Sequence, residues 1–192
     1  MNGKKGMSTR TMVLSGILIA TVILLQLLGA SIKFGPFSIS LVLIPIVIGA
    51  ATCGVWVGGL LGLVFGIVVL ATDAGAFLAV SVPGTVITVL LKGVLCGLAS
   101  GLVYKWLAKF NKYIAVIGAA LICPVVNTGV FLLGCLVFFM DTMRAWAEAA
   151  GLGGDVAGYM IFTLVGVNFL FEVGTNMILS PVIVRLLNIR NK

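Results

Sequence analysis

Histidine is absent from this chain of 192 residues, and its absence excludes several kinds of chemistry. The chain has no histidine base for a serine nucleophile, no H-E-x-x-H zinc site and no histidine proton relay. The phosphate-binding pattern G-x-x-x-x-G-K-[ST] is also missing, so ATP hydrolysis by that route is excluded. We therefore expect a binding or carrier protein rather than an enzyme, with no catalytic residues, metal ligands or cofactor.

Charged residues are scarce. They make up 9% of the chain, against 61% hydrophobic residues, and the mean hydropathy is +1.30. A soluble domain has roughly 25% charged residues, and a helix that crosses a membrane needs about 20 apolar ones. The composition thus predicts an all-α integral membrane protein with one domain over 1–192. The net charge of +7 does not indicate nucleic acid, because the basic residues lie at the ends of apolar runs.

The four cysteines are few and are not grouped for metal binding. Each lies in apolar sequence, and none forms a C-x-x-C pair: Cys53, Cys96, Cys123 and Cys135. This pattern is typical of small buried side chains rather than of disulfides or metal ligands.

Six apolar runs predict six transmembrane helices. Their ranges are about 11–30, 38–52, 54–71, 83–107, 112–139 and 158–187. Because the number is even, both termini are expected on one side of the membrane. The longest polar connection lies between the last two runs, over 140–157.

The distribution of positive charge predicts on which side of the membrane the two termini lie. Nine of the 12 basic residues lie at the N-terminus, in the fourth connection and at the C-terminus: Lys4, Lys5, Arg10, Lys105, Lys109, Lys112, Arg185, Arg190 and Lys192. Four of the five acidic residues fall in the opposite loops: Asp73, Asp141, Glu148 and Asp155. The positive-inside rule then places both termini in the cytoplasm. The opposite connections face outward and carry aromatic residues, among them Phe37, Phe77 and Trp146.

Glycines recur every four residues in two neighbouring runs. They are Gly54, Gly58, Gly62 and Gly66 in the third run, and Gly93, Gly97 and Gly101 in the fourth. Small residues at this spacing let helix backbones approach closely in lipid. We interpret both sets as helix-packing surfaces.

The fifth acidic residue, Glu172, lies inside the last apolar run. Asn168 precedes it by four residues and Asn176 follows it by four, so all three share one side of a helix. An ionised carboxylate near the bilayer midplane costs several kcal/mol unless it finds a partner or water. This polar stripe should therefore face the interior of the bundle.

The run 83–107 carries a second polar face, where Thr85, Thr88 and Lys92 follow one another at spacings of three and four. Lys92 and Glu172 form either a structural ion pair or two parts of a ligand site. In the run 112–139, Asn127 follows Pro124 by three residues. Interhelical hydrogen bonding alone would explain Asn127, but three polar faces in one bundle favour a shared pocket.

The order of these features resembles a known family. The basic N-terminus is followed by "ISLVLIPIVIGAATCGVWVGGLLGLVFGIVVL", then by "PGTVITVLLKGVLCGLASGLVYKWL" and "ICPVVNTGVFLLGCLVFF". This pattern is similar to the substrate-binding (S) components of energy-coupling factor (ECF) transporters, and most of all to the pantothenate-type vitamin binders. The similarity extends over about residues 11 to 187.

The resemblance implies a six-helix S-component-like bundle in a prokaryotic plasma membrane, which binds a vitamin-like molecule near its outer face. It implies that Lys92, Asn127, Asn168 and Glu172 line the pocket. Thr88 and Asn176 lie on the same polar faces as these residues, and we expect them in the site too. Phe37 and Phe77 are expected to stack on the ligand if it has a flat ring.

The family's partners are a transmembrane coupling (T) subunit and two cytosolic ATPases. Docking to the T subunit uses small residues four apart on the first helix, which match Gly16 and Ala20 here. Small pairs of this kind also occur where helices simply pack together.

Pantothenate fits the polar side chains in outline, because Lys92 can bind its carboxylate, and the amide and carboxylate side chains can bind its hydroxyl and amide groups. Riboflavin, folate or another polar metabolite would suit the same residues. Two other functions stay open: a self-sufficient ion-coupled transporter that uses Glu172, and a non-transporting structural membrane protein.

Overall fold

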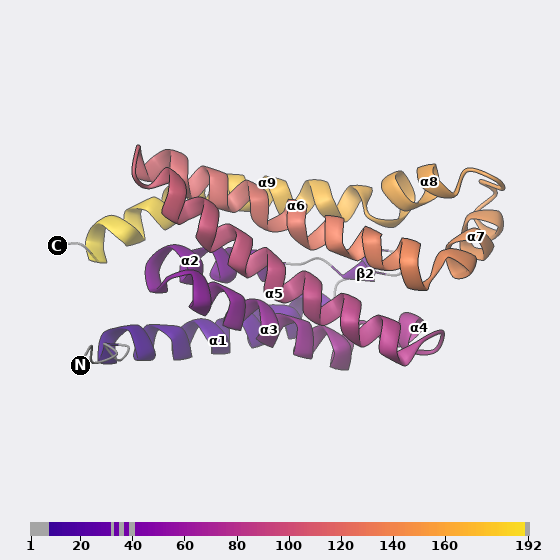
Figure 1. The fold of residues 1–192 in the computed structure, drawn as a ribbon, viewed down its shortest axis with the longest axis horizontal. Coiled ribbons are helices and arrows are strands. Elements are labelled where there is room, and N and C mark those ends of the chain that lie inside the picture. The colour runs from indigo at the N-terminus through magenta and orange to yellow at the C-terminus, as the bar shows by residue number, and fades with distance from the viewer. Residues whose placement is uncertain (1–7, 32, 35–36, 39–40, 191–192) are drawn as a thin grey trace, which may run out of the picture.

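The computed structural model describes residues 8–31, 33–34, 37–38 and 41–190, and side chains over 8–31 and 41–185. The chain is almost entirely helical (Figure 1). Its elements are α1 (Thr9–Ala30), β1 (Lys33–Phe34), β2 (Phe37–Ser38), α2 (Leu43–Cys53), α3 (Val55–Thr72), α4 (Gly75–Leu78), α5 (Val82–Leu107), α6 (Lys112–Phe138), α7 (Met140–Ala149), α8 (Val156–Gly158), the π-helical segment η1 (Tyr159–Leu164) and α9 (Gly166–Arg190).

Five helices of the described chain are long and apolar enough to cross a membrane: α1, α3, α5, α6 and α9. The second predicted span, 38–52, is not among them. Its helical part, α2, has 11 residues, which at about 1.5 Å per residue reach roughly half of the 30 Å hydrocarbon layer. The predicted span was too long, because its first residues include Ser38 and Ser40, which weaken the apolar run before Leu43.

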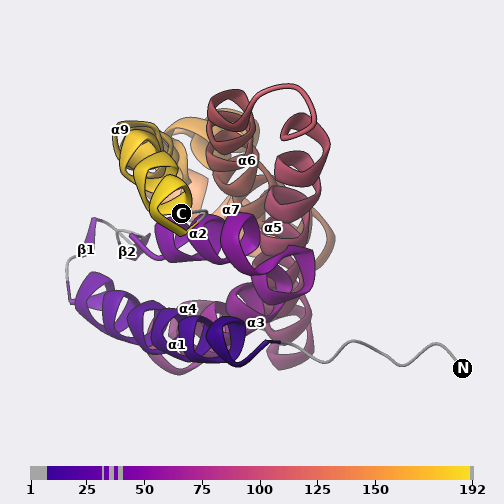
Figure 2. The same ribbon diagram turned by 90° about the vertical axis from the view of Figure 1, so that its left-hand side faces the viewer.

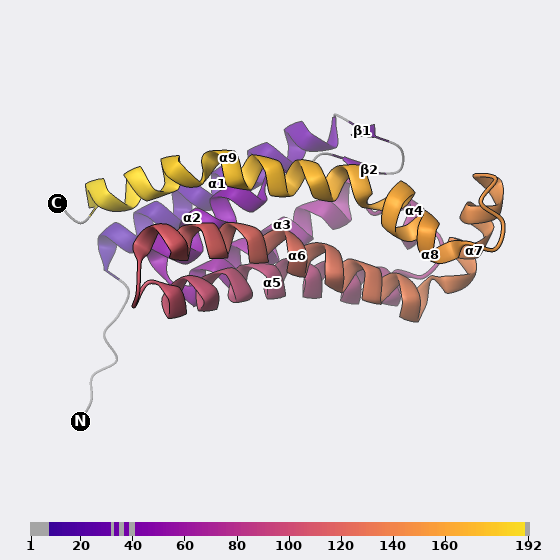
Figure 3. The ribbon, with the colours of Figure 1, turned by 90° about the horizontal axis from the view of Figure 1, so that it is seen from above.

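The chain still reverses direction twice between α1 and α3, so that these two helices run the same way (Figure 1). A two-stranded antiparallel hairpin pairs Lys33 with Ser38 and Phe34 with Phe37 before α2 begins. Gly54, with φ of +103°, then forms the one-residue joint between α2 and α3. As a result, the start of α1 and the end of α9 lie at the same end of the bundle, and α4, α7 and α8 lie at the other (Figures 1 and 3).

The last predicted span is interrupted, and the polar connection before it is partly helical. The predicted helix over 158–187 begins with η1 and becomes α-helical only at Gly166. The expected loop over 140–157 contains α7, whose Met143 and Ala147 are buried against the bundle. This stretch is polar, but it is rich in helix-forming Ala, Met, Arg and Glu, and the packing of these two side chains stabilises the helix further.

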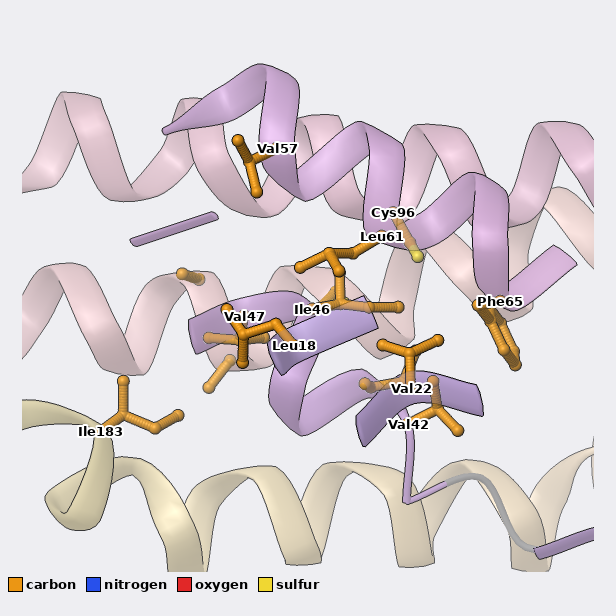
Figure 4. Packing of buried hydrophobic residues seen from close by; sticks show 14 of the residues in the cluster. Leu18, Val22, Val42, Ile46, Val47, Val57, Leu61, Phe65, Cys96 and Ile183 are labelled. Carbon is orange, nitrogen blue, oxygen red and sulfur yellow. The ribbon is translucent and has the colours of Figure 1, made fainter. Parts of the chain in front are cut away.

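The core surrounds α2, which lies at the centre of the bundle in contact with α1, α3, α5, α6 and α9 (Figure 2). Figure 4 shows side chains from several of these helices meeting there. They include Val22 from α1, Ile46 from α2, Leu61 from α3 and Cys96 from α5, all with no exposed surface. Apolar packing therefore fills the half of the bundle that contains the termini.

Glycines bring α3 and α5 into close contact. A Cβ atom added at Gly62 would overlap the carbonyl group of Gly93, and one added at Gly97 would overlap that of Gly58. Backbones can approach this closely only where neither residue has a side chain. The predicted packing role is consistent with this contact for all the glycines of the two sets except Gly54, where an added Cβ would meet nothing within 4 Å.

The close contact between α3 and α5 predicts different melting temperatures for two Gly→Ala variants. Gly62→Ala should lower the melting temperature of the purified protein, because overpacking costs about 1–3 kcal/mol. Gly174→Ala is the matched control, since a Cβ there meets nothing within 4 Å and alanine favours the helix by about 1 kcal/mol. Equal melting temperatures for the two variants would contradict the close contact.

Candidate functional site

A pocket lies in the half of the bundle opposite the termini. The space between its lining atoms is about 750 Å³, including the part open to solvent. Its polar lining residues are Gln26, Asp73, Thr85, Thr88, Lys92, Asn127, Thr128, Asn168 and Glu172. Its aromatic lining residues are Phe65, Phe77, Phe131 and Phe139.

The position of the pocket follows from the length of α2. The lining residues come from the C-terminal halves of α1, α3 and α6 and the N-terminal halves of α5 and α9, together with α4 and η1. These segments all lie toward the end of the bundle that α2 does not reach (Figure 1). The long helices continue past α2, and the space between them becomes the pocket.

The polar stripe on α9 faces the interior, and two of its three residues line the pocket. Asn168 Nδ2 donates a hydrogen bond to Glu172 Oε1 at 2.9 Å, and the Glu172 side chain is fully buried. Asn176 is also fully buried, but its Nδ2 donates to the backbone oxygen of Glu172 at 2.9 Å. It lies one turn beyond the residues that line the pocket.

The polar face of α5 brings Thr85, Thr88 and Lys92 to the pocket. Lys92 Nζ lies 5.2 Å from the ring centroid of Phe131 and 5.6 Å from that of Phe65. Both rings are within the roughly 6 Å at which a cation–π attraction is significant. The rings thus help to hold a positive charge inside an apolar bundle.

Asn127 of α6 is 4% exposed and lines the pocket opposite these groups. Its Oδ1 is buried and has no hydrogen-bond partner in the described part of the chain. Pro124 precedes it by one turn inside the continuous helix α6. The three polar faces predicted from α5, α6 and α9 therefore meet at one pocket in the structure.

Two residues that the sequence analysis did not place in the site belong to the lining. Gln26 of α1 is 1% exposed, and its Nε2 donates to Asp73 Oδ2 at 2.6 Å. Gln26 is the only glutamine of the chain, and its place inside an apolar run is the signal that could have identified it. Asp73 was expected in an outward loop, but it caps the end of α3 and turns toward the pocket.

Aromatic rings close one side of the pocket. The Phe77 ring packs edge-to-face against Phe131, Phe139 and Trp146, with centroids 5.6, 5.1 and 5.5 Å away. Phe77 itself lines the pocket, and its stacking on a ligand stays a prediction. Phe37 lies in β2, and its side chain falls outside the described residues.

The two residues expected at the partner interface lie apart from the pocket. Gly16 and Ala20 are both on the exposed side of α1. A Cβ atom at Gly16 would meet nothing within 4 Å, so this residue does not pack inside the chain. Its neighbour Ile17 is 58% exposed.

The family model for the ECF transporter substrate-specific component matches residues 10–184. The chain belongs to this family. No curated protein and no solved structure matches it significantly. The family consists of membrane subunits that bind a substrate for transport and are not enzymes, so this S component works with a T subunit and ATPase subunits on a small-molecule substrate.

The aromatic cluster gives a prediction for the walls of the pocket. Phe77→Ala should lower the melting temperature strongly, because truncating a buried phenylalanine costs about 3–5 kcal/mol. Phe162→Ala is the control, since that ring is 76% exposed. If both variants melted at the same temperature, Phe77 would not hold this side of the pocket together.

Proposed function

We propose that this S component captures a water-soluble vitamin or a similar micronutrient in the pocket described above, for import by the assembled ECF transporter. The observation that supports the proposal is a pocket lined by buried polar groups inside a largely apolar bundle. Thr88 Oγ1, Asn127 Oδ1 and Asn168 Oδ1 are buried without hydrogen-bond partners among the described residues.

These groups favour binding over a purely structural role. Each unsatisfied buried polar atom costs about 1–3 kcal/mol, and apolar residues at the same positions would avoid that cost. A set of such atoms around one pocket is expected where a ligand supplies the missing hydrogen bonds. Polar side chains that served only to join helices would instead bond to one another.

Pantothenate is the cargo that we propose to test first, because the family resemblance suggests it and Lys92 suits its carboxylate. Its ammonium group is the only cation among the described residues that line the pocket, and it would bind the carboxylate of pantothenate. The amide groups of Asn127 and Asn168 would bind the hydroxyl and amide groups. The aromatic lining would contact the dimethyl part of the molecule.

We place the protein in a prokaryotic plasma membrane with both termini in the cytoplasm. Lys105, Lys109 and Lys112 are exposed near the connection between α5 and α6, at the same end as the start of α1 and the end of α9. Asp141 and Glu148 are exposed at the other end. With this orientation, the pocket lies in the outer half of the membrane.

Ligand binding tests this proposal directly. In a thermal-shift panel of water-soluble vitamins, one compound should stabilise the purified protein. If the cargo is pantothenate, Lys92→Met should weaken its binding by about tenfold or more, because a charge-assisted hydrogen bond contributes about 1.5–3 kcal/mol.

Panthenol, which has a hydroxyl in place of the carboxylate, provides the control for Lys92. Its affinity should change little in the Lys92→Met variant. An unchanged dissociation constant for pantothenate would remove Lys92 from the site.

Uptake driven by an ion gradient in vesicles that contain this chain alone would contradict the ECF mechanism.

Docking to the T subunit is proposed for the exposed face of α1 around Gly16 and Ala20. Replacing either residue by leucine should block transport by the assembled complex, because the added side chain would keep the helices apart. The affinity of the isolated S component for its ligand should stay the same, since neither residue lines the pocket. Unchanged transport would exclude this face as the interface.

A further inference from the structure

Two carboxylates of the pocket are each paired with a neutral amide. Gln26 Nε2 donates to Asp73 Oδ2, and Asn168 Nδ2 donates to Glu172 Oε1. The first pair joins α1 to the end of α3, and the second lies within α9. All four residues line the pocket, so this combination of groups occurs twice in one site.

Each carboxylate determines how its amide is oriented. An ionised carboxylate only accepts hydrogen bonds, so the amide must direct its NH₂ group toward it. At an ionised carboxylate a flipped amide would bring two acceptors together, so the orientation with the NH₂ group toward the carboxylate is the favoured one. The carbonyl oxygens, Gln26 Oε1 and Asn168 Oδ1, are then directed away from the carboxylates.

These carbonyl oxygens are buried and have no hydrogen-bond partner in the described part of the chain, and the same is true of Asn127 Oδ1. An amide oxygen only accepts hydrogen bonds. The buried groups of this lining that still lack a partner are therefore mostly acceptors. Thr88 Oγ1, which can donate or accept, is the exception.

We infer that Gln26 and Asn168 are specificity-determining residues that accept hydrogen bonds from O–H or N–H groups of the cargo, each held in place by its carboxylate. The inference rests on the proposed function and narrows the substrate class. The cargo carries at least two hydroxyl, amino or amide N–H groups, and a molecule that offers only acceptors is rejected because these oxygens would stay unsatisfied.

Analogues that lack one donor test this inference. Each vitamin of the panel is compared with its deoxy or desamino analogue, in which one hydroxyl or amino group is replaced by hydrogen; pantothenate and its two monodeoxy analogues are one such set. For a vitamin that binds, loss of the correct donor should weaken binding to the wild-type protein by about tenfold.

Variants then identify the residue that accepts the hydrogen bond. In Gln26→Met or Asn168→Leu, the preference for the vitamin over the corresponding analogue should fall below about twofold, because the acceptor has been removed. Asn176→Leu is the matched control: Asn176 is buried on the same helix with its own unpartnered Oδ1, but it does not line the pocket. The preference should persist in that variant.

The outcomes separate this inference from the proposed function. A vitamin that binds as tightly after loss of any single donor would overturn the inference alone. The inference would also be overturned if both Gln26→Met and Asn168→Leu still preferred the vitamin over its analogue that lacks one donor. Absence of binding by every vitamin of the panel would overturn the proposed function, and this inference with it.

Discussion

α2 is enclosed by five longer helices but has only 11 residues itself, and the position of the pocket follows from that difference. Its apolar side chains fill the centre of the bundle near the termini (Figure 4). Beyond its end, the surrounding helices have no central helix to pack against. They present polar and aromatic side chains to the space between them instead.

The polar side chains of the pocket are stable in an apolar bundle because they are arranged in groups. Lys92 lies against the rings of Phe65 and Phe131, and Asp73 and Glu172 each accept a hydrogen bond from a neighbouring amide. These contacts reduce the cost of burying charge. They also fix the orientation of the groups, which is what selective binding requires.

The sequence was informative where a polar residue interrupts an apolar run. Lys92, Asn127 and Glu172 stood out because polar groups are costly in lipid, and the structure places all three at one pocket. Glycine spacing predicted a packing surface on α3 and another on α5 for a related reason. In both cases the prediction succeeded because a buried polar residue, or a row of glycines, has few possible roles in a membrane helix.

Other features depend on three-dimensional packing and could not be predicted in the same way. The second span was predicted too long, because Ser38 and Ser40 interrupt the apolar run before Leu43 without marking where α2 begins. α7 combines helix-forming residues with Met143 and Ala147, which are buried one turn apart, and its polar residues led to the prediction of a loop. Asp73 resembled a loop residue, since only the fold brings it next to Gln26.

The most direct measurement is mass spectrometry of the small molecules released from the purified protein, compared with those from a Lys92→Met/Asn168→Leu double variant. If the pocket is a cargo site, the wild-type protein releases one water-soluble compound in a ratio of about one per chain, and the double variant releases little or none. Release of no compound by the wild-type protein, or of the same amount by both, would contradict a substrate site in this pocket.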